Sequence, residues 1–188
     1  MLSKDQDITV LLHQWHAGDQ AAGDEIFRLL MHDLKEIAAR SLRRDRPNHT
    51  LQRTELVNEA FMKLAVANQV IDWRDRGHFF AITTIKMRRF LIDYFRKKPK
   101  QDIFSLEDLP EGVIAGRTRL EVRLAVDQLL DELEKESPTV CAIVVARTYI
   151  GYEVKEIAEN FGLPLRTVER HWHNGRKWLF ERLSKSKK

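Results

Sequence analysis

A helix-turn-helix pattern over residues 153–183 constrains the fold of this 188-residue chain more than any other feature. Its first segment places apolar residues at helical spacing on one face, at Val154, Ile157, Ala158 and Phe161. Gly162 suits the left-handed conformation that ends a helix, and Pro164 suits the opening of the next helix. The second segment forms one continuous apolar stripe through Val168, Trp172, Gly175, Leu179 and Leu183. The pattern therefore predicts two packed helices joined by a tight turn.

The opposite face of the second segment carries polar and basic side chains, namely Arg166, Thr167, Glu169, Arg170, His173, Asn174 and Lys177. Such groups can reach phosphates and base edges, and an α-helix fits the major groove of DNA. The alternative is an ordinary amphipathic hairpin whose polar face is only solvated. The ordered turn, the apolar spacing and the basic excess together favour DNA binding over that alternative.

The charge of the chain is unevenly distributed, although the formal net charge is only +4. Seven Lys or Arg and one acid lie within residues 86–100, and eight bases and two acids lie within residues 166–188. Between these stretches, residues 102–136 hold four bases and ten acids. Two basic stretches separated by an acidic one suggest a polyanion that is held at two places.

Apolar periodicity predicts helices before the helix-turn-helix as well, over residues 5–16, 21–44, 54–64, 78–97, 120–135 and 136–149. Asp19 is placed to cap the second of them. No strand pair is required, because β-branched runs such as AIVVA lie between helix signals. Residues 98–118 contain two prolines and two glycines and show no sustained period. We therefore expect an all-α protein of two small helical domains, residues 1–98 and 119–188, joined by a flexible linker over residues 99–118.

The segment TELVNEAFMKL, which starts at Thr54, divides its residues between a core and a surface. Thr54 is expected to cap the helix, and the apolar positions that point to a core are Leu56, Val57, Ala60, Phe61 and Leu64. The positions left facing outward are Glu55, Asn58, Glu59 and Met62. An exposed methionine beside acids could dock another protein, and the alternative is a solvated helix face.

A turn-rich loop over residues 68–77 leads into a helix that is rich in basic side chains. Those basic residues lie mostly away from its apolar face, and they are Lys86, Arg88, Arg89, Arg96 and Lys97. Such cations neutralise phosphates, and aromatic rings near a loop can stack on unpaired bases. Most aromatic residues of this region fit a core. Trp73 and His78, at the edge of the loop, are the better candidates for base contact.

Nothing in the sequence points to catalysis, a metal or a cofactor. His13 and His16 could share a helix face, but no nearby Cys or acidic cluster completes a metal site. The chain has no HExxH, no P-loop glycine pattern and no nucleophile elbow. The single cysteine, Cys141, cannot form an intramolecular disulfide and fits a small core residue in a reducing cytoplasm. Neither a signal peptide nor an apolar run of membrane-spanning length is visible.

Three stretches, in this order, resemble a known family. TELVNEAFMKL, preceded by RDRPNHTLQR, resembles region two of bacterial RNA polymerase sigma factors, and WRDRGHFFAITTIKMRRFLIDYFRK resembles the promoter-engaging part of that region. EKESPTVCAIVVARTYIGYEVKEIAENFGLPLRTVERHW, followed by RKWLFERL, resembles region four. The short linker between them is similar to that of the extracytoplasmic-function (ECF) class. Region four alone is also similar to LuxR-type regulators, and the joint occurrence with region two makes the resemblance to sigma factors specific.

The resemblance implies a role for each group of residues. The outward positions of the 54–64 segment would dock on the clamp helices of core RNA polymerase, with the flap as a second contact. Arg74, Asp75 and Arg76 would take up a flipped base of the minus-ten element. The basic residues of the 78–97 helix would hold the adjoining DNA, and the polar face of the second helix-turn-helix segment would read the minus-thirty-five element. An anti-sigma factor is a further partner that the family implies.

Two competing interpretations are weaker. A LuxR-like regulator that acts without polymerase would need a sensory or receiver domain, and residues 1–100 show no alternating strand pattern for one. A recombinase or metalloenzyme would need a catalytic Ser or Tyr or a set of metal ligands, and none can be identified. We therefore expect a non-catalytic sigma factor that directs promoter-specific transcription initiation.

Overall fold

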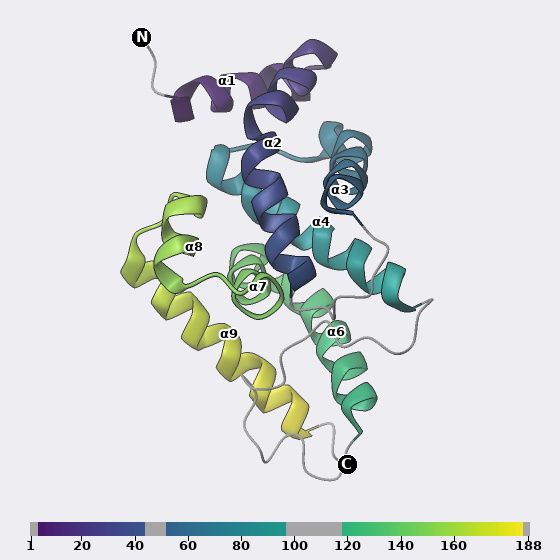
Figure 1. Cartoon of the computed structure of the whole chain (residues 1–188). Coiled ribbons are helices and arrows are strands. Elements are labelled where there is room, and N and C mark those ends of the chain that lie inside the picture. The colour runs from purple at the N-terminus through teal and green to yellow at the C-terminus, as the bar shows by residue number, and fades with distance from the viewer. Residues whose placement is uncertain (1–3, 44–51, 97–117, 186–188) are drawn as a thin grey trace.

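The computed structural model describes residues 4–43, 52–96 and 118–185, and every regular element in those ranges is helical. Figure 1 shows an elongated arrangement, with the N-terminal helices above and the C-terminal helices below. The predicted all-α class is confirmed. The linker predicted over residues 99–118 lies outside the described ranges except for its last residue.

The N-terminal half consists of α1 (Lys4–His16), α2 (Gln20–Arg43), α3 (Arg53–Ala67), the short 3-10 turn η1 (Asn68–Val70) and α4 (Arg76–Arg96). α2 packs against both α1 and α3, and α4 packs against α3. The start of α2 follows the chemistry expected from the sequence. Asp19 Oδ1 accepts hydrogen bonds from the amides of Ala21 and Ala22 at 3.0 and 3.3 Å.

The start of α3 differs from the prediction that Thr54 caps it. The helix begins one residue earlier, at Arg53, and Gln52 occupies the capping position in extended conformation. Glu55 completes a capping box, because its Oε2 accepts from the Gln52 amide at 3.4 Å. The physical reason is the position of Glu55, which is three residues after Gln52 and can therefore reach back to that amide.

The C-terminal half consists of α6 (Arg119–Glu136), α7 (Pro138–Val145), the π-helical segment η3 (Ala146–Ile150), α8 (Val154–Phe161) and α9 (Leu165–Lys185). Thr118 caps α6, since its hydroxyl accepts from the Glu121 amide at 3.2 Å. The single helix expected over residues 136–149 is instead α7 followed by η3. The Thr148 hydroxyl donates to the Val144 carbonyl at 2.8 Å, a back-bond of a kind that commonly distorts the regular helical ladder.

The turn between α8 and α9 has the geometry that its sequence predicts. Gly162 adopts φ +61°, the left-handed region, and the Leu163 amide donates to the Ala158 carbonyl at 3.0 Å. Pro164 precedes α9, and its carbonyl accepts from the amides of Thr167 and Val168 at 2.9 and 3.2 Å. α8 and α9 therefore form a helix-turn-helix.

The two halves pack directly against each other. α4 contacts α7 and α8, and α2 contacts η3. Figure 1 shows α7 and α8 facing α2 and α4 at the middle of the molecule. The buried apolar residues form one cluster that includes members of both halves. The predicted domain boundaries stay a prediction, but the chain in this structure is closed rather than extended into two separate bodies.

Candidate nucleic-acid and polymerase interfaces

The polar face of α9 is open to solvent. Its exposed members are Arg166, Glu169, Arg170, His173, Asn174 and Lys177, and Thr167 is half-buried. The opposite side is packed, with Val168 and Leu183 fully buried and Leu179 3% exposed. Trp172 is only partly buried, and the Arg176 guanidinium lies 5.4 Å from the centre of its ring. The structure thus gathers all seven predicted residues on one accessible helix face.

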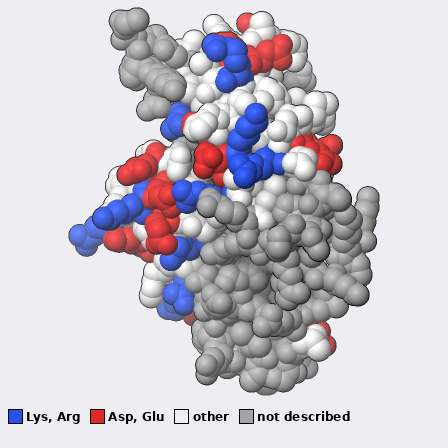
Figure 2. All heavy atoms as spheres, in the orientation of Figure 1, with Lys and Arg blue, Asp and Glu red and all other residues white. Residues whose placement is uncertain are grey.

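Charge on the side of the molecule that carries α8 and the start of α9 is mixed. Figure 2 shows basic and acidic side chains lying next to each other there, rather than a field of one sign. A mixed surface of this kind attracts DNA less strongly at long range than a uniformly basic one. Close contacts in a groove would therefore have to supply much of any specificity.

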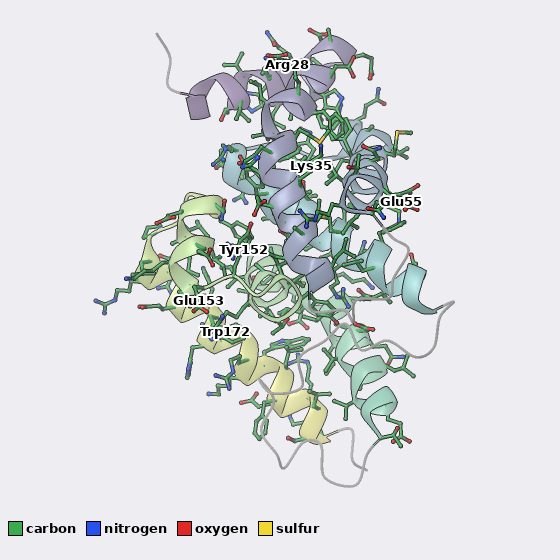
Figure 3. The ribbon with its side chains drawn as sticks, in the orientation of Figure 1. Arg28, Lys35, Glu55, Tyr152, Glu153 and Trp172 are labelled. Atoms are coloured by element: carbon green, nitrogen blue, oxygen red, sulfur yellow. The ribbon has the colours of Figure 1, made fainter. Side chains whose placement is uncertain are left out.

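The outward face of α3 also has the predicted geometry. Glu55, Asn58 and Glu59 are exposed, and Met62 is 63% exposed. Figure 3 shows Glu55 on the outer side of α3. Val66, which is 85% exposed, continues this surface one helical turn past Met62, and Val70, which is 87% exposed, follows in η1. Neither valine was predicted, although the spacing of Val66 from Met62 could have identified it.

Trp73 is a core residue in this conformation, so the expectation that its ring is accessible at the loop edge is wrong, and its contact with a base stays a prediction. The side chain is 1% exposed, and its ring stacks on Trp15 with the ring centres 5.9 Å apart. Its indole N–H donates to Asn68 Oδ1 at 2.7 Å. The reason for the error is tertiary, because α1 supplies an aromatic surface and Asn68 supplies an acceptor for the only polar atom of the ring.

Two histidines and one asparagine hold the loop between α3 and α4 in place. His13 Nε2 lies 2.8 Å from the Trp73 carbonyl oxygen, and His16 Nδ1 lies 2.9 Å from the Asn68 carbonyl oxygen. Asn68, which is 3% exposed, donates from Nδ2 to the Trp15 carbonyl at 2.6 Å. His13 and His16, which the sequence analysis considered only as possible metal ligands, therefore help to fix the backbone of this loop.

The rest of the loop stays partly accessible. Arg74 and Asp75 are exposed, and Asp75 Oδ1 accepts from the His78 amide at 2.7 Å, which caps α4. Burial, assisted by the Arg74 charge, lowers the pKa of His78, so its half-buried ring favours the neutral form. Arg76 pairs with Asp33 of α2 at 2.9 Å and lies over the ring of Phe80.

Arg88 and Arg89, at the centre of α4, face acids of the C-terminal half. Arg88 is 1% exposed, so its side chain is not on the accessible surface where it was expected, and its contact with DNA stays a prediction. Its guanidinium donates to Asp127 and Asp131 of α6, both at 3.1 Å. Arg89 donates to Glu134 of α6 at 2.7 Å. We call these five residues the α4–α6 ion cluster.

Lys86 and Arg96 complete the description of this helix. Lys86 is half-buried, and burial together with the nearby Arg89 charge lowers its pKa. Arg96 is the last residue of α4, and Lys97 lies outside the described residues. The helix was predicted to present a row of cations to DNA, whereas in this structure the cations at its centre are already paired.

A family model described as ECF sigma factor matches residues 5–185. The chain belongs to the ECF sigma factor family. Members of this family act with RNA polymerase as sigma factors and are not catalysts. No curated protein matches the chain. One similar solved structure is described as "Structure of CnrH in complex with the cytosolic domain of CnrY"; the identity is 20%, the TM-score is 0.42, and the match covers 97% of this chain and 99% of that one.

Two kinds of feature are absent from the described ranges. No helix there has both the length and the apolar composition that crossing a membrane requires. No group of three or more His, Cys, Asp or Glu side chains in the same residues is arranged to hold a metal ion.

Proposed function

We propose that this ECF sigma factor binds core RNA polymerase through the outer face of α3 and directs it to promoters through two DNA contacts. Residues 1–98 would form the polymerase-binding and minus-ten domain, and residues 119–188 the minus-thirty-five domain. The site of action would be the cytoplasm. The observation that supports this most directly is the polar face of α9, which is exposed except for the half-buried Thr167 and follows a helix-turn-helix turn of the expected geometry.

The proposed reading of the minus-thirty-five element rests on α9. Arg170 and Asn174 are exposed and one helical turn apart, so both can address the same groove. An arginine can pair bidentately with guanine, and an asparagine with adenine. Glu169 lies beside them and can accept from a cytosine amino group. The first half of α9 would therefore supply base contacts, and Lys177 farther along would contact phosphate.

The proposed docking on polymerase rests on α3. Glu55 and Glu59 give this face negative charge, and Met62 and Val66 add exposed apolar area. A surface of this composition suits a partner that offers basic groups around an apolar patch, as the clamp helices would. The flap of polymerase is proposed as a second contact, made by the C-terminal domain, and an anti-sigma factor as a regulatory partner.

The decisive experiment is reconstitution with core RNA polymerase. The purified chain should associate with core enzyme, and transcripts made from genomic DNA should begin downstream of one shared pair of promoter elements. Transcripts with random starts, or no association, would contradict the proposal. A LuxR-like regulator would bind DNA in this assay without binding core enzyme.

Glu59→Lys tests the docking face in the same system. Because Glu59 is exposed, we expect its stability to change by no more than about 0.5 kcal/mol. Affinity for core enzyme should fall by at least about tenfold, since a like charge would then face the basic clamp. Glu159→Lys on α8 is the matched control, because Glu159 is an exposed acid outside the proposed interface. Equal losses in both variants would exclude α3 as the docking surface.

A further inference from the structure

The loop of residues 71–75, between η1 and α4, has its backbone fixed by side chains of two helices (Figure 1). His13 of α1 lies with Nε2 2.8 Å from the Trp73 carbonyl oxygen. His78 of α4 accepts through Nδ1 from the Arg74 amide at 3.3 Å. Side chains that leave such a fixed backbone have defined directions, and selective recognition of a ligand requires that.

The side chains of this loop alternate between the interior and the solvent. Trp73 is buried, whereas Asp72 and Arg74 on either side of it are exposed. The loop begins in extended conformation, with φ −88° and ψ 114° at Ile71, and in an extended chain residues two positions apart point to the same side. Burial lowers the pKa of His78, the Arg74 charge lowers it further, and the Asp72 charge opposes both. Asp72 and Arg74 therefore project together, close to one ring.

The two acids of the loop differ in what engages them. Asp75, which was predicted to contact a base, caps α4, because its Oδ1 accepts from the His78 amide at 2.7 Å. Asp72 was not predicted to contact a base, and within the described residues its carboxylate has no hydrogen bond or ion pair. Asp72 is thus the acid of this loop that is available to a ligand.

A carboxylate can be matched to a DNA base but not to a phosphate. Phosphates offer only acceptors and carry negative charge, so they repel an acid. The Watson–Crick edge of an unstacked base offers N–H donors. Adenine, cytosine and guanine each present an exocyclic amino donor and an acceptor on that edge, which suits a carboxylate beside a guanidinium. Thymine has no amino group, and its ring N–H lies between two carbonyl oxygens that would repel a carboxylate.

We propose that Asp72 determines which base this loop accepts. Its carboxylate accepts from the exocyclic amino group of an unstacked adenine, cytosine or guanine, while Arg74 donates to the acceptor on the same edge. Thymine is rejected because it offers the carboxylate no suitable donor. The inference rests on the proposed function, since the base is one of the minus-ten element, and it adds the residue that selects the base and the chemical class that is selected.

The first experiment measures base preference in the holoenzyme reconstituted with core RNA polymerase. A promoter library has its minus-ten region randomised and held open as a mismatched bubble, and the DNA that the holoenzyme retains is sequenced. At one position, native holoenzyme should select an amino-bearing base over thymine by about tenfold or more. Asp72→Asn, whose amide can donate to a thymine carbonyl, should reduce this ratio to about threefold or less at that position alone.

The matched control is Asp93→Asn on α4, which removes an exposed aspartate charge outside the loop. Both variants change the net charge equally, so an altered preference in the control measures the effect of charge alone. Unchanged thymine rejection in Asp72→Asn, or an equal change in Asp93→Asn, would overturn the proposal. So would a native holoenzyme that rejects thymine at no position of the minus-ten element.

A second measurement needs no polymerase. Single-stranded pentathymidine is compared with three pentamers that carry adenine, cytosine or guanine at the centre, and the amide signals of Asp72 and Arg74 are followed by nuclear magnetic resonance. The three amino-bearing pentamers should shift both signals more than pentathymidine does, and Asp72→Asn should abolish the difference at Arg74. Equal shifts with all four pentamers, or none, would overturn base selection by the loop.

The two measurements separate this inference from the proposed function. If the pentamers are distinguished but reconstituted transcription fails, the proposed function is wrong and base selection by the loop stands. If transcription starts at defined promoters but thymine is rejected at no minus-ten position, the proposed function stands and the role of Asp72 is wrong.

Discussion

The two proposed DNA surfaces carry similar side chains but differ in what covers them. α9 presents Arg170, Asn174 and Lys177 to solvent, whereas α4 turns Arg88 and Arg89 toward the acids of α6. The difference comes from position in the fold. α9 lies at the edge of the molecule and packs through one apolar stripe, while α4 lies at the centre and contacts α3, α7 and α8. Similar helix faces can therefore be available for binding or occupied by the protein itself.

This contrast bears on the proposed function, in which the chain holds DNA at two places. In this structure the polar face of α9 is accessible, whereas Arg88 and Arg89 of α4 are paired with acids of α6. Association with DNA through α9 alone would give limited affinity, because a second set of phosphate contacts is missing.

The largest effect expected from this comparison is on folding stability. Arg88→Ala should lower the free energy of unfolding by about 3 kcal/mol, because it leaves Asp127 buried without its cation. We take the lower end of the range for broken buried pairs, since Asp131 is 53% exposed. Arg170→Ala, on the open face, should change stability by no more than about 0.5 kcal/mol. Urea unfolding followed by circular dichroism measures both, and similar losses in the two variants would remove the distinction between the faces.

A smaller effect on stability is expected from replacing an asparagine, and here too a buried residue can be compared with an exposed one. Asn68→Ala should cost about 2 kcal/mol, because it removes the acceptor of the buried Trp73 indole and the donor to the Trp15 carbonyl. Asn174→Ala, on the exposed face of α9, should cost less than about 0.5 kcal/mol but weaken promoter selection. Thermal unfolding and transcription in parallel separate the two outcomes. A stable Asn68→Ala protein would show that the loop network contributes little to the fold.

Local sequence patterns were sufficient to predict the helices and the sides on which they pack. The division of α3 into buried Leu56 and exposed Met62 follows from a period of 3.6 residues, and so does the stripe of α9. The left-handed conformation of Gly162 at the end of α8 could also be predicted, since it is set by the immediate neighbours of this residue. These features depend on interactions within a few residues of each other.

What the sequence could not show is which polar or aromatic side chains meet across the fold. Trp73 lies at the edge of a loop, and the residues next to it in the sequence do not indicate whether its side chain is exposed or buried. It is buried because its ring stacks on Trp15 of a helix that is distant in the sequence. Arg88 has the spacing of a surface residue on α4, and only the approach of α6 buries it. The acidic character of residues 102–136 was visible, but the pairing of Asp127, Asp131 and Glu134 with arginines of α4 depends on tertiary structure.

The smallest effect expected concerns the ion pair between Arg40 and Glu156, which can sharpen the comparison by showing how firmly the halves are held. The hydrogen bond from Arg40 lowers the pKa of Glu156 below its ordinary value of 4.5. The unfolded chain therefore binds more protons than the folded chain in the window just below that value. The stabilising contribution is complete above it and is lost as the pH falls through the folded pKa.

Because both side chains are about one-third exposed, with 29% and 33% accessible, the contribution should be less than about 1 kcal/mol. Glu156→Gln should accordingly flatten the fall of unfolding free energy between about pH 5 and pH 3 relative to the native chain. Glu159→Gln, on the same helix but outside the interface, should leave that fall unchanged. Urea unfolding at a series of pH values measures the slope. Fluorescence energy transfer between dyes attached at Lys35→Cys on α2 and Lys155→Cys on α8 follows the distance between the halves over the same range. If transfer drops with the same midpoint as the lost stability, the pair holds the halves together; if stability falls while transfer is constant, Glu156 acts only as the cap of α8.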